Sequence, residues 1–358
     1  MKRGIFGNNF KIFKFFDKKE IGSIPRILIS SFLLISLFYS APILSKFSNE
    51  DNQGFQNNSK AVLAYTLKNQ GRENLNENSI LDEKDLLVDI FSLNELETDT
   101  VRLNASTIKQ LFEDTNYSLK DVREKKLVKP VALTLLPAEI KMIENTKQRK
   151  EFFIQIVLPL ILQENNNIKL DRKRLFSIIN KSNNSDLEKK WLQKKYKQYG
   201  VSSKDLSTLK IRMDEIPVSL AIAQAAKETG WGTSRFAQEG NALFGQWTWS
   251  GEGLKPKDAD KNQGHKVMKF NVLQASVRAY QRNLNTHSSY KNLRKARAVL
   301  RDNGKMLDSL ILVKYLNEYA ETGEKYVEVL TQIIKQNNLK DFDDAKLLPS
   351  SIELESLI

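Results

Sequence analysis

Apolar residues at helical spacing dominate the chain after residue 101. Residues 147–166 follow this spacing and predict a largely buried helix. Pro159 lies inside that stretch, where we expect it to start a turn or a kink because proline has no backbone N–H to donate. The same spacing predicts further helices at 170–181, 184–199, 203–212, 217–229, 272–284, 291–302, 305–319 and 324–336.

Strand-like patterns are short and few. Residues 129–140 indicate an extended or strand-like lead-in to the first long helix, because apolar residues there lie at close, partly alternating positions. Residues 246–270 allow at most a short hairpin. The hydrophobic pattern therefore predicts a mainly α domain with a short β-hairpin.

An uncharged apolar segment runs from Ile27 to Leu44. As a helix it would span about 27 Å, which is close to the thickness of a bilayer core. Residues 1–26 carry a net charge of +5, and such a basic flank usually stays in the cytoplasm. We predict a membrane anchor at 27–45 that places the following chain across the membrane. A cleaved signal peptide and a buried core helix are the alternatives.

The chain after this segment is acidic and poor in apolar residues. Residues 49–100 carry eleven acidic and four basic side chains, and such a composition buries too little apolar surface to offset chain entropy. We predict a flexible tether over 46–115, in which the short apolar stretch Leu86–Ile90 is able to dock on a folded part.

The remaining residues, 101–358, hold a net charge of +14. A basic domain can bind nucleic acid, an anionic membrane surface or an anionic polymer. The predicted membrane segment puts this domain outside the cytoplasm, so nucleic acid is not an expected partner. The sequence thus divides into a basic leader, a membrane segment, a tether, a folded domain and a C-terminal tail, at residues 1–26, 27–45, 46–115, 116–345 and 346–358.

Composition excludes several chemistries. The chain has no cysteine and two histidines, so it has no disulfides, no zinc–cysteine site and no thiol nucleophile. A histidine-rich metal site is not expected either, whereas a carboxylate-only ion site stays open. We expect no cofactor.

The predicted helix 217–229 carries the clearest candidate for chemistry. Pro217 suits its first turn and Gly230 its end. Glu228 follows Ala221 by seven residues and Ala225 by three, which places a carboxyl group on the buried stripe at the helix end. Partial burial and the negative end of the helix dipole both disfavour its charged form, as a general acid requires. The alternative is that Glu228 lies at the exposed edge of the helix and pairs with a neighbouring lysine.

The residues around Glu228 resemble a known signature. The run from Glu228 to Gly232 reads E-T-G-W-G, and Gly240–Gly245 reads G-N-A-L-F-G, which is similar to the motifs of the glucosaminidase family of peptidoglycan hydrolases. Residues 269–286 and 319–327 resemble the Bax-type branch of that family. The resemblance covers roughly residues 120–340.

The resemblance implies a lysozyme-like α+β fold and hydrolysis of the β-1,4 bond after N-acetylglucosamine in peptidoglycan glycan strands. Glu228 matches the catalytic acid of the family, and Tyr319 matches a tyrosine that lines the cleft and supports the reaction. Asn241, Phe244 and Gly245 match the turn at the floor of the cleft. The Bax-type match also implies a single-pass protein of the bacterial inner membrane with its catalytic domain in the periplasm, or a secreted one if the signal is cleaved. It does not identify a protein partner.

One departure from the family pattern keeps alternatives open. Many members carry a second carboxylate after the F-G turn, where Glu252 is the nearest acid but matches no family position. A lytic transglycosylase that uses the same Glu228 needs no second carboxylate, and neither does attack by the N-acetyl group of the substrate. A non-catalytic glycan-binding wall protein is the third alternative.

Further residues are candidates for holding sugar. Trp247 and Trp249 flank one residue, so an extended segment would turn both indoles to one face for stacking on sugar rings. Arg235, His265 and the basic residues of 291–301 could bind anionic groups of the wall, whereas Trp231 is expected to be structural.

Overall fold

A computed structural model describes residues 89–90, 93, 101–202, 205–248, 253–255 and 266–349. The predicted leader, the predicted anchor 27–45 and most of the predicted tether lie outside these residues. Within the described part of the chain, no helix is both long and apolar enough to cross a bilayer. The predicted mainly α class with a few short strands is confirmed.

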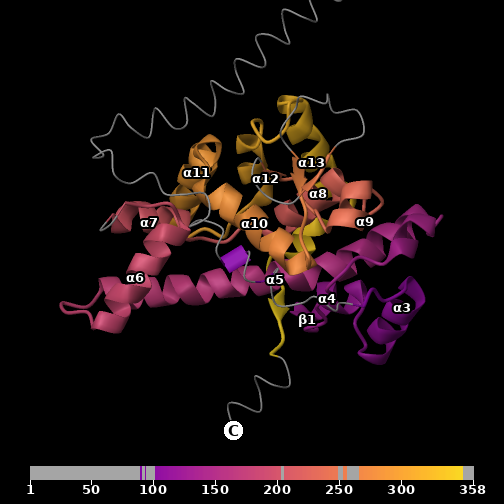
Figure 1. Ribbon diagram of the computed structural model, residues 1–358, viewed down its shortest axis with the longest axis horizontal. Helices are drawn as coiled ribbons and strands as arrows, with labels where there is room; N and C mark the ends of the chain where they lie inside the picture. Colours follow the sequence, from indigo (N-terminus) through magenta and orange to yellow (C-terminus); the bar gives the residue numbers. More distant parts are fainter. Residues whose placement is uncertain are drawn as a thin grey trace, which may run out of the picture. The chain divides into compact units, whose positions relative to one another are not determined.

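Most of the described residues lie in helices (Figure 1). In chain order the helices and 3₁₀ helices are α3 (Ala105–Asp114), α4 (Leu119–Lys125), η1 (Ala138–Met142), α5 (Thr146–Ile179), α6 (Asp186–Gln198), α7 (Leu206–Arg212), α8 (Val218–Thr229), α9 (Arg235–Gly240), α10 (Leu273–Thr286), η2 (Ser288–Tyr290), α11 (Lys291–Asp302), α12 (Ser309–Leu312), η3 (Val313–Tyr315), α13 (Glu324–Gln336) and η4 (Leu339–Phe342).

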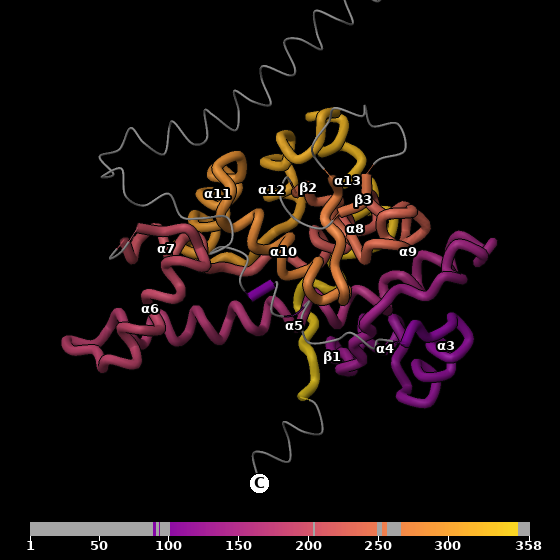
Figure 2. The backbone as a smooth tube through the Cα atoms, viewed as in Figure 1, coloured from indigo at the N-terminus to yellow at the C-terminus, as the bar shows by residue number. Residues whose placement is uncertain are grey.

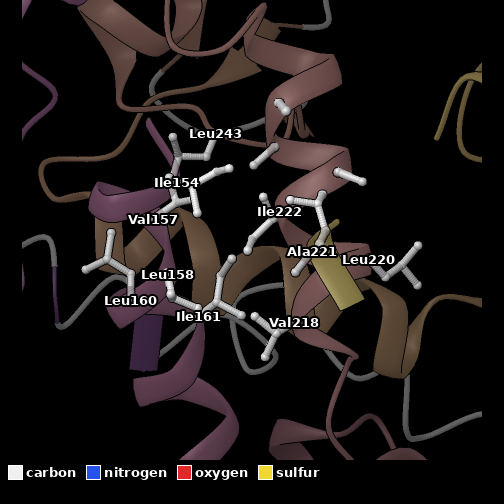
Figure 3. Packing of buried hydrophobic residues seen from close by; sticks show 14 of the residues in the cluster. Ile154, Val157, Leu158, Leu160, Ile161, Val218, Leu220, Ala221, Ile222 and Leu243 are labelled. Atoms are coloured by element: carbon white, nitrogen blue, oxygen red, sulfur yellow. The ribbon is translucent and has the colours of Figure 1, made fainter. Parts of the chain in front are cut away.

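Helix α8 is buried over all of its residues from Val218 to Ala226. It packs against α5, α13 and η4. Side chains such as Val157 and Ile161 of α5 meet Ile222 of α8 in the core (Figure 3). Asp343 fixes the start of α8, because its carboxylate accepts hydrogen bonds from the backbone N–H and the hydroxyl of Ser219, both at 2.8 Å.

Helix α5 is 34 residues long and continues through Pro159, so the turn expected as one possibility at this proline does not form. Residue 159 has no N–H for the carbonyl of Gln155, four residues earlier. The hydroxyl of Tyr117 donates to this carbonyl at 3.0 Å. The helix 170–181 that we predicted separately is the second half of α5, which forms a small core with α6 and α7 as the chain turns back towards α8 (Figure 2).

Two short sheets occur among the described residues. Strands β2 (Trp247–Thr248), β4 (Lys266–Met268) and β3 (Gly253–Leu254) form an antiparallel sheet in that order, within the region predicted as a hairpin. Strands β1 (Leu127–Val128) and β5 (Lys346–Leu347) pair in parallel. The second pairing corrects the predicted start of the tail at residue 346, because the folded part includes β5. Residues 129–137 contain no strand.

Folded structure also begins earlier than predicted. The tether was expected to reach residue 115, but α3 spans Ala105–Asp114 and buries Ile108 and Phe112 in the main core. Further upstream, Ile90 is fully buried against Met268 and Phe270, as the docking expected for Leu86–Ile90 requires. A further correction concerns the helix expected at 305–319, where only the short α12 and η3 form.

Candidate active site

Helix α8 ends abruptly just after Glu228. Gly230 and Trp231 both adopt the left-handed conformation, with φ of 57° and 61°, and both backbone N–H groups point to the carbonyl of Ala226. The indole of Trp231 packs edge-to-face on Phe153 at 6.0 Å between ring centroids, which is the structural role predicted for it. The E-T-G-W-G run therefore stops the helix and leaves Glu228 in its last turn.

The carboxyl group of Glu228 is half-buried and has two different oxygens. Oε1 accepts a hydrogen bond from the hydroxyl of Tyr326 at 2.8 Å. Among the described residues, Oε2 has no hydrogen-bond partner, and it faces Gly245, where a methyl group on Cα would lie only 3.3 Å away. Burial raises the pKa of Glu228 above its ordinary 4.5, against smaller opposing effects of Tyr326 and Lys227. The group therefore keeps its proton to a higher pH than an exposed glutamate does.

The turn that carries Gly245 is fixed on both sides. Asn241 is left-handed, with φ of 49°, and its amide donates to the carbonyl of Phe270 at 2.8 Å. The ring of Phe244 stacks on Tyr280 at 3.8 Å between centroids. Asn241 and Phe244 are both buried, so their side chains shape the turn and are not exposed to a substrate.

Tyr319 contacts this turn and not Glu228 directly. Its hydroxyl donates to the carbonyl of Phe244 at 2.9 Å, and its ring stacks on Tyr326 at 5.5 Å between centroids. The tyrosine that bonds Glu228 is Tyr326, to which sequence reasoning gave no role. A signal for it was present: Tyr326, Leu330 and Ile334 form the buried stripe of α13, and a buried tyrosine hydroxyl needs a partner.

A second residue that the sequence did not single out lies behind Tyr326. Gln224 is one turn before Glu228 on α8 and fully buried. Its amide nitrogen donates to the hydroxyl of Tyr326 at 3.1 Å, and its amide oxygen accepts from the hydroxyl of Tyr280 at 2.7 Å. The carboxyl group is thus the end of a buried chain of hydrogen bonds.

Comparison with known proteins assigns this chain to a family. The family model described as mannosyl-glycoprotein endo-beta-N-acetylglucosaminidase, called glucosaminidase, matches residues 203–339. Protein bax of Escherichia coli strain K12 is 30% identical over 205 residues, which are 56% of this chain and 73% of that protein. The chain belongs to the glucosaminidase family, as a Bax-type member. The catalytic domain of the autolysin Auto from Listeria monocytogenes aligns with 49% of this chain and 97% of its own, at 20% identity and a TM-score of 0.26.

The matched region of this Bax-type glucosaminidase contains Glu228, Gln224, Tyr319 and Tyr326. Trp249, Glu252 and His265 lie outside the described residues. Within the described part, Tyr326 and Lys227 are the side chains that shift the pKa of Glu228, and neither is a carboxylate. No set of three or more potential metal-binding side chains occurs among the described residues.

Two further residues predicted to bind the substrate, Trp247 and Arg235, differ in their surroundings. Trp247 is 51% exposed on β2, two residues after Gly245. The guanidinium of Arg235 donates to the carbonyl of Lys255 and to Glu239, so it holds the residue that directly follows β3.

The basic face expected at 291–301 is largely wrong. Arg294 and Arg297 of α11 are buried and donate to backbone carbonyls, among them those of Leu284 in the last turn of α10 and Ile211 in the last turn of α7. The last turn of a helix leaves such oxygens without a partner in the helix itself. Arg301 pairs with Asp214 and Glu215 at 3.1 and 2.6 Å.

Proposed function

We propose that this glucosaminidase hydrolyses the β-1,4 bond after N-acetylglucosamine in peptidoglycan, with Glu228 as the general acid. One observation carries the proposal: the Glu228 carboxyl is half-buried at the end of α8, with one oxygen bonded to Tyr326 and the other at the Gly245 turn. Family membership supports the class of reaction.

The proposed step is proton transfer to the glycosidic oxygen. Oε1 is occupied by Tyr326, so the substrate oxygen approaches Oε2 beside Gly245, which itself has no side chain. Protonation lets the sugar bond break with less charge on the leaving oxygen. A positioned acid of this kind contributes about 10²- to 10⁴-fold to the rate, and the raised pKa of Glu228 keeps more of it protonated near neutral pH.

The second half of the hydrolysis needs water, together with either a base that activates it or a nucleophile that first binds the sugar. Glu252 is the nearest acid after the turn, and the N-acetyl group of the substrate is the other candidate nucleophile. If the 6-hydroxyl of the sugar attacks in place of water, the same Glu228 serves a lytic transglycosylase. Exposed Trp247 suits stacking on a sugar ring beside the turn, in any of these reactions and in a glycan-binding protein without catalysis.

We further propose that residues 27–45 anchor the chain in the inner membrane and that the catalytic domain works in the periplasm. The basic leader and the uncharged apolar segment support this placement.

The test is digestion of purified peptidoglycan by the full-length chain, with mass spectrometry of the fragments. Wild type is compared with Glu228→Gln and with Glu113→Gln, an exposed glutamate on α3 that serves as the matched control. We expect fragments with a reducing N-acetylglucosamine end from wild type and from Glu113→Gln, and none from Glu228→Gln. Anhydro-muramic ends would assign a transglycosylase instead, and sedimentation with the polymer without cleavage would assign a binding protein.

A further inference from the structure

A chain of buried hydrogen bonds links three helices to Glu228. It runs from Tyr280 on α10 to Gln224 on α8, then to Tyr326 on α13 and back to Glu228 on α8, over distances of 2.7, 3.1 and 2.8 Å. Tyr280, Gln224 and Tyr326 are all buried, so none of the three is exposed to a polymeric substrate.

The amide of Gln224 gives this chain a direction. Its oxygen can only accept, and it takes the hydrogen of Tyr280. Its nitrogen can only donate, and it points to the hydroxyl oxygen of Tyr326. A tyrosine hydroxyl has one hydrogen, and that of Tyr326 is left for Oε1 of Glu228. Oε1 is therefore an acceptor, and the carboxyl proton is on Oε2.

We propose that Gln224 is a positioning residue, which fixes the acidic proton of Glu228 on the oxygen that faces the Gly245 turn. This inference rests on the proposed role of Glu228 as general acid. Without the amide donor, the oxygen of Tyr326 could accept a hydrogen bond from a proton on Oε1. The carboxyl group would then donate into the protein interior, and fewer molecules would present a proton at Oε2.

The same change alters the acidity of Glu228. With Gln224 in place, Tyr326 donates to the carboxyl group and favours its charged form, which lowers the pKa of Glu228 against the effect of burial. Loss of the amide gives the neutral form an acceptor, so the pKa of Glu228 rises. The other titratable groups that interact with Glu228 among the described residues are Tyr319, Tyr290 and Lys227. Burial raises the pKa of both tyrosines, which moves their titration away from neutral pH.

The test is Gln224→Met, which keeps the length of the side chain and removes the amide. The matched control is Gln281→Met on α10, another buried glutamine whose amide nitrogen donates to Asn165 at 2.9 Å. With soluble glycan strands as substrate, we expect kcat of Gln224→Met to fall about tenfold with little change in KM. The alkaline limb of its pH profile should move to higher pH. In Gln281→Met the alkaline limb of the pH profile should stay where it is in the wild type.

A direct titration separates this inference from the proposed function. Infrared difference spectra between each protein and its Glu228→Gln counterpart report the protonated carboxyl without any substrate. A higher apparent pKa of Glu228 in Gln224→Met than in Gln281→Met supports the inference, and equal values overturn it. If wild type cleaves no glycan while the titration shows the shift, the proposed function fails and the positioning of the proton stands.

Circular dichroism shows whether Gln224→Met folds. If it does not fold, a second variant tests the inference. Tyr326→Phe removes only the hydroxyl that donates to Glu228, and it should also raise the apparent pKa of Glu228. Its control is Tyr117→Phe, which removes a buried hydroxyl bonded to the carbonyl of Gln155. An unchanged pKa of Glu228 in Tyr326→Phe overturns the inference.

Discussion

Gly245 faces Glu228 so closely that a methyl group on its Cα would lie 3.3 Å from Oε2 of the carboxyl. Gly245 also has φ of 60°, a conformation in which a Cβ is strained. The absence of a side chain thus serves both the turn and the access to Oε2. The F-G pair of the motif can be understood from this contact, because Phe244 anchors the turn and Gly245 leaves Oε2 without a methyl group beside it.

Gly245→Ala should therefore reduce activity more than stability. We expect a stability loss of about 1–2 kcal/mol from the left-handed backbone and a loss of about tenfold or more in kcat/KM, because the new methyl group covers Oε2. Urea unfolding and glycan digestion measure the two effects. The matched control is Gly304→Ala, which has φ of 64° and open space around Cα; it should lose stability and keep activity. Equal activity in the two variants would contradict the proposed approach of the substrate.

Glu228 should make folding less favourable as pH rises. Its pKa is raised in the folded state, so the folded state holds the proton more tightly than the unfolded state does. This contribution to stability is complete below the ordinary value of 4.5 and is lost as pH rises through the folded pKa. Glu228→Gln, which stays neutral, should gain melting temperature relative to wild type between pH 4 and pH 8. A constant difference between Glu228→Gln and wild type over this range would mean that burial does not raise the pKa of Glu228.

The helices that the sequence predicted best are those with a clear apolar stripe and definite ends. Helices α8, α11 and α13 begin and end within one residue of the predicted bounds. Local spacing decides such helices because each stripe packs against the core. The prediction of a turn at Pro159 was wrong because a residue far away in the chain supports the helix there. Tyr117 donates to the carbonyl that the proline leaves without a partner in α5.

In the candidate site, too, the features set by neighbouring residues were predicted and those set by distant residues were not. The motif predicted Glu228 and the turn from Asn241 to Gly245, whose conformations depend on residues next to each other in the chain. The roles of Tyr326 and Gln224 could not be predicted from neighbouring residues, because the hydrogen bond from Tyr326 to Glu228 joins residues 98 positions apart. Such a contact depends on how α13 packs against α8, which no local pattern specifies.

Ile90 should contribute to the stability of the catalytic domain although it lies far upstream of α3. Its side chain is fully buried among Met268, Phe270 and neighbouring apolar residues, and Asp89 beside it pairs with Arg282 at 2.9 Å. Ile90→Ala in the full-length chain should cost about 2–5 kcal/mol in urea unfolding. Val101→Ala is the control, because Val101 is 79% exposed. Equal stability of the two variants would show that the segment is not docked in solution.

Tyr117 should stabilise α5 specifically because residue 159 is proline. The hydroxyl of Tyr117 donates to the carbonyl of Gln155, which has no helical partner at Pro159. Tyr117→Phe should cost about 1–3 kcal/mol, since it leaves a buried carbonyl without a donor. In a Pro159→Ala background the new backbone N–H can reach that carbonyl, so the same Tyr117→Phe change should cost clearly less. Urea unfolding of the four proteins gives this coupling energy, and a value near zero would mean that the hydroxyl does not replace the missing N–H.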